Sequence, residues 1–410
     1  MLLYHMLSLA KDGDDSARPD AFSFHAVING FIYSKMRDAG RRAESVLERG
    51  LEYAEEDGGI MLEMKSFTSI LGYYGRQTKV IDSPYRAQYL LDRLISLYKA
   101  GFTHLSPHVS CFTNVMEAYA AQRHRDAGEI SEEILRTMIK LQKHHNATNI
   151  EVNTGVMNSI LYSWAECVGH EDAGERAEHI LDLMEKKSGT GFHSMAPNYR
   201  SYNLVTKAWS TSNRRNKAEK ALTILERVKN NSRLRETPDE YIYSLVIHAC
   251  AFSADSRPGS NTEKRAFEIA VRVMDELIDD VPTNREEPSA ITYGWFFQVC
   301  GRLWGVPEES KASHVRRIFS RCCEKGRFTD FVLTGVKKAT SNALFNELMS
   351  EVVSNQQTTT NMKETVQLAH LPKSWICNDA YAAKRTKRIG IGKDIRKNRT
   401  SSTRFKSKVK

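Results

Sequence analysis

Histidine and cysteine pairs are the first candidates for catalytic or metal chemistry in this chain of 410 residues. His104 and His108 are four residues apart, but Pro107 lies between them and argues against a helix that would present both to a metal. Cys322 and Cys323 are adjacent, which suits neither a zinc site nor an easy disulfide. None of the seven cysteines forms a Cys-x-x-Cys pair, and most lie at apolar positions, so we expect buried free thiols in a reducing compartment.

The common catalytic signatures are missing from the sequence. It contains no glycine-rich phosphate loop, no nucleophile elbow and no His-Glu-x-x-His motif, and His144 and His145 form a polar, loop-like pair. Residues 326–410 lack the clustered Asp or Cys-His ligands that metal chemistry needs. We therefore predict that the protein is not an enzyme and has no cofactor, no metal site and no small-molecule substrate.

Large aromatic or apolar residues recur every 41 to 50 residues along the chain. These anchors are Phe24, Phe67, Phe112, Met157, Tyr202, Tyr243 and Tyr293. Apolar residues follow three, four and seven positions later, as Val115, Met116 and Tyr119 follow Phe112, and this spacing predicts one face of an amphipathic helix. Five of the ten prolines lie five residues before an anchor, mostly followed by a residue that can cap a helix, as in Pro197-Asn198.

A second amphipathic helix follows in each unit, and its stripe begins at a small residue, as in Ala177-Ile180-Leu181-Met184. One such helix pair cannot bury its own apolar face, whereas stacked pairs can. The sequence therefore predicts an all-α fold, a solenoid of about seven helix–turn–helix repeats.

The repeat pattern divides the chain into four parts. Residues 1–20 resemble the second helix of a truncated repeat, 21–325 hold seven repeats, 326–378 form irregular capping helices, and 379–410 are a basic, disordered tail. Because we expect the chain to begin inside a repeat, any targeting peptide would lie outside this sequence.

Charge is distributed unevenly along the chain. Residues 381–410 carry twelve Lys or Arg and one acid, whereas the remaining 380 residues carry 47 basic and 49 acidic side chains. The tail could hold phosphates through its charge, or it could be a solvated end or a nuclear import signal. No run of 18 apolar residues occurs, so we expect no membrane span.

Three segments, GVMNSILYSWAE (155–166), SYNLVTKAWS (201–210) and PDEYIYSLVIHAC (238–250), resemble pentatricopeptide repeats. The units here are longer than is usual in that family, and LPKSWICN (371–378) resembles the long-unit repeat proteins of algal organelles. The resemblance implies a right-handed superhelix that binds single-stranded RNA in a mitochondrion or plastid, in RNA processing, stability or translation. We expect a monomer, with protein partners as a further possibility.

The resemblance also implies which side chains contact bases, with one base per repeat. One residue follows the anchor, and we call the seven residues at this position the row: His25, Thr68, Thr113, Asn158, Asn203, Ser244 and Gly294. Five of the seven are Thr, Asn or Ser, and the alternative is that they are polar residues on the solvated side of the helix. The other contacting residue is the last residue of the unit. We name as RNA-binding residues His25, Thr68, Thr113, Asn153, Asn158, Asn198, Asn203, Asp239 and Ser244. Three consecutive pairs have an implied base preference. Thr113 with Asn153 implies adenine, Asn158 with Asn198 implies a pyrimidine (cytosine more than uracil), and Asn203 with Asp239 implies uracil.

Two alternatives stay open from the sequence. The last residue of each unit is of a type that caps helices whether or not RNA binds. The family's base-sandwiching position, two before the anchor, is usually aliphatic, but here it is Lys65, Ser110, Gly155 or Arg200 in four of seven units. The rival function is a protein-binding helical-repeat scaffold with no RNA contact, which the near-neutral body of the chain favours.

Overall fold

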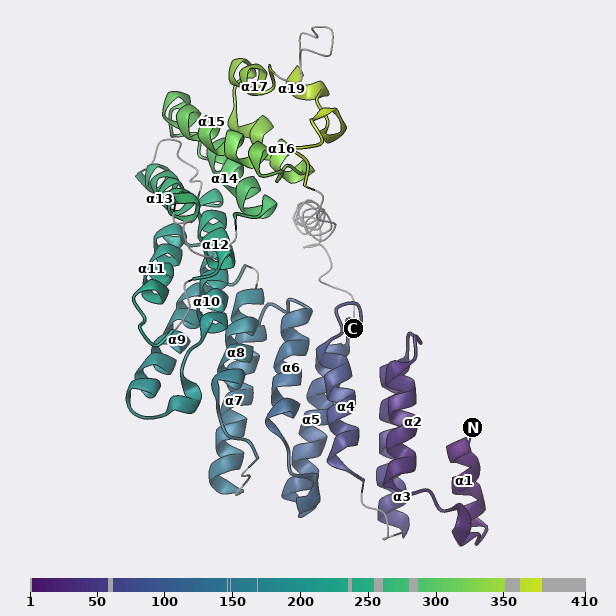
Figure 1. The fold of residues 1–410 in the computed structure, drawn as a ribbon. Helices are drawn as coiled ribbons and strands as arrows, with labels where there is room; N and C mark the ends of the chain where they lie inside the picture. Colours follow the sequence, from purple (N-terminus) through teal and green to yellow (C-terminus); the bar gives the residue numbers. More distant parts are fainter. Residues whose placement is uncertain are drawn as a thin grey trace, which may run out of the picture. The chain divides into compact units, whose positions relative to one another are not determined.

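The computed structural model describes residues 2–57, 62–145, 147, 149–167, 169–234, 238–253, 261–279, 287–350 and 362–377 (Figure 1). These residues contain eighteen α-helices and no β-strand, and their single isolated β-bridge joins Phe328 and Ile376. The predicted all-α fold is confirmed. The chain divides into two compact units, Met1–Ala208 and Trp209–Lys410, and helix α10 (Tyr199–Thr211) runs across the division.

Seven helices carry the predicted anchors, and in every one the anchor is the fourth residue. These first helices of the repeats are α2 (Ala21–Tyr33), α4 (Met64–Gly75), α6 (Val109–Ala121), α8 (Thr154–Glu166), α10, α12 (Glu240–Ala251) and α14 (Ala290–Arg302). No anchor exposes more than 1% of its surface. The predicted stripe is the buried face of the first helices, except that Val27 and Phe31 of α2 are half-buried.

Most first helices start where a side chain caps them. The backbone N–H of Ser23 donates to Asp20 Oδ1 (2.7 Å), and Val156 N–H donates to Asn153 Oδ1 (3.1 Å). Asp239 and Ser289 cap α12 and α14 in the same way. Because the first N–H groups of a helix have no partner within it, these oxygens fix the start of each unit.

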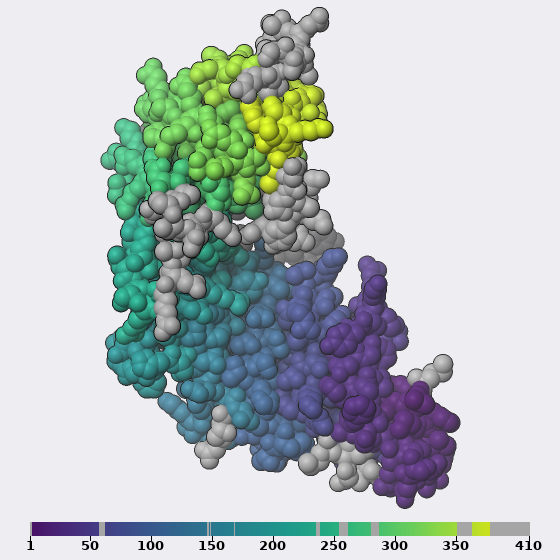
Figure 2. Space-filling view, in the orientation of Figure 1, coloured from purple at the N-terminus to yellow at the C-terminus, as the bar shows by residue number. Residues whose placement is uncertain are grey.

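A second helix follows the first helix in each pair. The second helices are α3 (Ala39–Asp57), α5 (Ser83–Lys99), α7 (Ala127–His144), α9 (Ala173–Gly189), α11 (Lys217–Lys229), α13 (Asn261–Asp279) and α15 (Glu308–Glu324). In the first unit α2, α4, α6 and α8 also pack on one another in chain order, as do α12 and α14 in the second. Neighbouring pairs of the first unit leave no gap between them on the face shown in Figure 2.

Ion pairs join second helices of neighbouring pairs. Arg86 of α5 meets Glu44 of α3 at 2.9 Å, and Arg272 of α13 meets Glu226 of α11 at 2.7 Å. Pairs of this kind also join α9 to α7 and α15 to α13. In each of these ion pairs the arginine lies 42 to 46 residues after the acidic residue, which is about the length of one repeat.

Beyond α15 the chain continues as further helices. Helix α16 (Asp330–Ala339) packs on α14, and α17 (Asn342–Leu348) packs on α15. The segment before residue 378 returns to this region, where Phe328 N–H donates to the Trp375 carbonyl at 2.8 Å. At the other end, α1 (Leu2–Lys11) packs on α2.

The predicted tail, residues 379–410, lies outside the described residues. Within the described part of the chain, no helix is both long and apolar enough to cross a membrane.

Candidate nucleic-acid interface

The residue that follows an anchor lies at the junction between its own first helix and the next one. His25 Nδ1 lies 3.4 Å from the Ser66 hydroxyl of α4. Asn158 of α8 contacts Ser201 of α10 in the corresponding place. Both serines come directly before the next anchor, so the repeat produces the same local arrangement at two junctions that are far apart in the sequence.

Asn158 and Asn198 form the tightest of the predicted pairs. Asn158 Nδ2 donates to Asn198 Oδ1 at 3.2 Å, and Asn158 Oδ1 accepts from the Ser201 hydroxyl at 2.7 Å. Asn158 is only 5% exposed, whereas Asn198 is exposed and its Oδ1 also caps α10 by accepting from Ser201 N–H. The structure thus brings Asn158 and Asn198 together, and most of their polar side-chain atoms already form hydrogen bonds within the protein. Among the described residues, Asn198 Nδ2 has no hydrogen-bond partner.

The threonines of the row are half-buried and less constrained. Thr68 donates to the Lys65 carbonyl of its own helix at 3.0 Å, and Thr113 donates to the Ser110 carbonyl at 3.4 Å. Each hydroxyl can still accept a hydrogen bond from a ligand. Within the described residues no hydrogen bond joins Thr113 to Asn153, whose side chain caps α8.

The last members of the row differ in accessibility. Asn203 of the first unit is half-buried, and Asp239 of the second unit is exposed and caps α12. Ser244 is only 7% exposed. At Gly294 a Cβ atom would lie 2.2 Å from Phe331 Cδ1, so the ring of α16 fills the space that a longer side chain would need at this position.

Charged side chains of the same helices lie near the row and were not among the predicted site residues. Glu166 is buried, and it bonds Lys207 of α10 and meets Arg123 at 3.3 Å. Burial raises the pKa of the Glu117 carboxyl, and Arg200 and Arg76 act in the opposite direction. Their spacing in the sequence could have identified them. Glu117 and Lys207 each follow their anchor by five positions, and so lie on the same helix face as the row.

The cysteines show no sign of reactive chemistry. All seven are free, and six are buried. Burial raises the pKa of Cys111 to about 11 and that of Cys300 to about 12, so these thiols stay protonated at neutral pH. In the described ranges no three His, Cys, Asp or Glu side chains gather as a metal site requires.

Comparison with known proteins gives no independent assignment. No family model matches this chain, and no curated protein matches it. The resemblance to pentatricopeptide repeats therefore depends on the residues and spacings of this sequence alone.

Proposed function

We propose that this protein is a single-stranded RNA-binding helical-repeat protein that acts in RNA processing, stability or translation in an organelle. In this proposal the helix pairs stack as a right-handed superhelix of pentatricopeptide type, and the residues after the anchors face successive bases. The observation that carries it is the 3.2 Å contact between Asn158 and Asn198. The resemblance pairs these two positions, and they meet across the junction of α8 and α10.

The chemistry of this pair suits exchange with a base edge. An amide presents one acceptor and two donors, so a base that approaches the exposed Asn198 can bond its Nδ2. If the base then replaces the Asn158–Asn198 bond, hydrogen bonds are exchanged and no buried polar atom is left without a partner. Such exchange favours bases whose donors and acceptors match and penalises those that leave a group unpaired.

The implied preferences can be tested with short RNAs. We expect RNA that contains A-C-U to bind better than scrambled RNA of equal length, as measured by fluorescence anisotropy at fixed salt. Asn203→Ala should cost about 1–3 kcal/mol at the uracil-containing site, the scale of one base contact, with little change in non-specific affinity.

Thr113→Ala has a matched control on a second helix. Thr137 of α7 is also half-buried, and its hydroxyl also donates to its own helix, at Glu133. Thr113→Ala should weaken binding of the A-C-U RNA, whereas Thr137→Ala should not. Equal binding to homopolymers, with no effect of Thr113→Ala or Asn203→Ala, would contradict base recognition.

The alternative is a protein-binding scaffold, and one observation favours it. Residues 1–380 carry 49 acidic and 47 basic side chains, and Glu166 and Glu117 place acids beside the row. RNA-binding grooves are usually basic, because phosphate contacts dominate affinity. Crosslinking in cells separates the two functions, since recovery of RNA supports the proposal and recovery of protein alone supports the scaffold.

A further inference from the structure

One edge of the first unit is formed by the turns that lead from a first helix to its second helix. The first three of these turns are residues 34–38, 76–82 and 122–126. They hold three acidic residues and six basic ones, namely Lys35, Arg37, Arg76, Lys79, Arg123 and Arg125. The next turn of this kind, residues 167–172, holds two acids and no Lys or Arg. Basic charge is therefore concentrated at the turns of three consecutive repeats.

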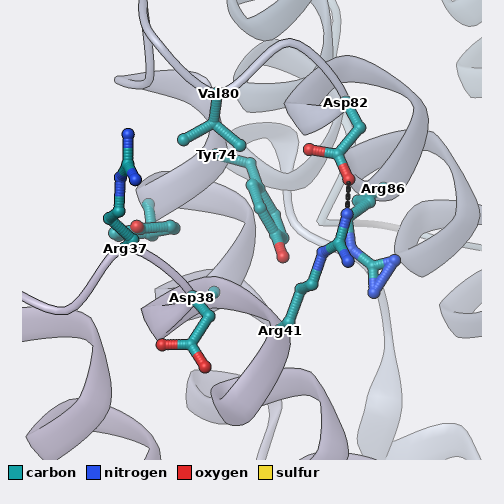
Figure 3. Close-up of a pocket in the computed structure, with 9 residues that line it drawn as sticks. Arg37, Asp38, Arg41, Tyr74, Val80, Asp82 and Arg86 are labelled. Atoms are coloured by element: carbon teal, nitrogen blue, oxygen red, sulfur yellow. Dashed lines mark hydrogen bonds and ion pairs between the residues drawn. The ribbon is translucent and has the colours of Figure 1, made fainter.

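The three turns are in contact with one another. Gln122 Nε2 of the third turn donates to the Val80 carbonyl of the second turn at 3.0 Å. Arg41, near the start of α3, donates to Asp82 of the second turn at 2.6 Å. Arg37 of the first turn and Val80 of the second turn line the same cavity (Figure 3). The three turns thus form one continuous surface, which we call the basic edge.

Most cations of the basic edge are available to a partner. All six are exposed. Four of them form no ion pair among the described residues, namely Lys35, Arg37, Lys79 and Arg125. Of the other two, Arg123 meets Glu166 at 3.3 Å, and Arg76 lies near Glu117.

The acids of the three turns do not cancel this charge. Asp38 accepts from Arg42 at 2.8 Å and Asp82 accepts from Arg41 at 2.6 Å, so each is paired with an arginine of α3 that lies outside the turns. The third acid, Asp126, is exposed. Helices α3, α5 and α7 also begin at this edge, and their N-terminal N–H groups carry partial positive charge. The basic edge therefore carries an excess of positive charge.

Large apolar side chains are exposed among these cations. Tyr33, the last residue of α2, and Ile81 of the second turn are both 83% exposed, and no other large apolar side chain in the described ranges is more exposed. Met36 is 41% exposed and lies between Lys35 and Arg37 in the sequence. Exposed apolar side chains that lie between Lys and Arg are suited to an apolar phase behind a layer of negative charge.

We propose that the basic edge binds the surface of an anionic lipid bilayer. The Lys and Arg side chains lie at the level of the negatively charged headgroups, and Met36 and Ile81 enter the apolar layer beneath them. Tyr33 is suited to the boundary between the two, because its ring is apolar and its hydroxyl is polar. A nucleic acid would pair with the cations alone and would leave Met36 and Ile81 in water. This inference does not depend on base recognition, and it holds for either of the functions considered above.

The test is co-sedimentation of the full chain with lipid vesicles. The wild type should sediment with vesicles of phosphatidylcholine and phosphatidylglycerol in equal parts, less so as salt is added, and not with vesicles of phosphatidylcholine alone. The basic triple variant carries Lys35→Gln, Lys79→Gln and Arg125→Gln together. Each Lys or Arg near an anionic surface strengthens binding about fivefold, so this variant should bind about tenfold or more weakly.

A matched control lies toward the other end of the second helices. Lys99 of α5 and Lys140 and Lys143 of α7 are exposed, and they form no ion pair among the described residues. The control triple variant, with Lys99→Gln, Lys140→Gln and Lys143→Gln, loses the same charge and keeps the basic tail. It should bind anionic vesicles like the wild type. An equal loss of binding in the two triple variants would show that only net charge matters, and would overturn the proposal.

The apolar side chains distinguish a membrane from a nucleic acid. Ile81→Ser should weaken vesicle binding several-fold, because the residue no longer leaves water on binding. Phe102→Ser, which changes a 41% exposed residue in a turn between two repeats, should not. If the edge holds RNA instead, the basic triple should lose affinity for RNA of random sequence, and neither it nor Ile81→Ser should lose affinity for vesicles. That result would refute membrane binding, whereas Thr113→Ala should bind vesicles normally, so failure of base recognition can be told apart from failure of this edge.

Discussion

Replacing Asn158 by alanine should destabilise the protein even when no RNA is present. The change removes two hydrogen bonds of a nearly buried side chain, one to Asn198 and one from Ser201. A net contribution of about 0.5–1.5 kcal/mol for each bond gives a loss of about 1–3 kcal/mol. Ser201 keeps its contacts with Asn198, which compensates part of the loss, so we expect about 1–2 kcal/mol. The assay is urea unfolding followed by circular dichroism, with a lower midpoint and an unchanged slope.

The accompanying variants show whether this loss belongs to the pair. Asn198→Ala should cost about 1 kcal/mol through loss of the cap on α10. The double variant should cost less than the sum of the two, because the shared bond is lost only once. Thr113→Ala, whose hydroxyl bonds only its own helix, should change stability by less than about 0.5 kcal/mol. If Asn158→Ala unfolds like the wild type but loses RNA affinity, the amide serves recognition, and our account of it as part of the junction is wrong.

Three further predictions concern packing, capping and the tail. Gly128→Ala would place a Cβ atom 2.2 Å from Trp164 Cδ2, so the melting temperature should fall and the free energy of unfolding should drop by about 1–3 kcal/mol. Gly189→Ala is the control, because a Cβ atom there would meet open space, and it should not destabilise the protein. Asp20→Ala should cost about 1 kcal/mol in urea unfolding at neutral pH. Since hydrogen bonds lower the pKa of Asp20, this difference should be present above the ordinary Asp pKa and disappear as the pH falls through the lowered value. Deleting 381–410 should weaken RNA binding and flatten its salt dependence without changing the melting temperature, and a large loss of stability would show that the tail packs on the body.

Local periodicity was enough to predict the helices and their starts. Phe24, Met157 and Tyr293 differ in chemistry, yet each lies one turn into a first helix and is buried, because an amphipathic helix must turn its apolar stripe toward a neighbour. Asn153 and Asp239 cap their helices because a short side-chain oxygen there satisfies N–H groups that any helix leaves free. Such properties depend on a few neighbouring residues.

The accessibility of the row could not be predicted from periodicity. Asn158, Thr113 and Gly294 occupy equivalent positions in the repeat, but one is bonded across a junction, one is half-buried, and one lies under a phenyl ring. The partners that cause these differences, Asn198 and Phe331, lie about 40 residues further along the chain. Only the packing of neighbouring helices brings them into contact.

The sequence alone determined the helix pairs, their repeat length, their capped starts and the concentration of basic charge in the last thirty residues, because each follows from local pattern and composition. The tertiary structure decided which polar atoms remain available to a ligand. It paired Glu166 with Lys207, and it brought Asn158 together with Asn198. The physical reason is that hydrogen bonding and burial depend on side chains from different repeats, whose distances are set by how the helices pack.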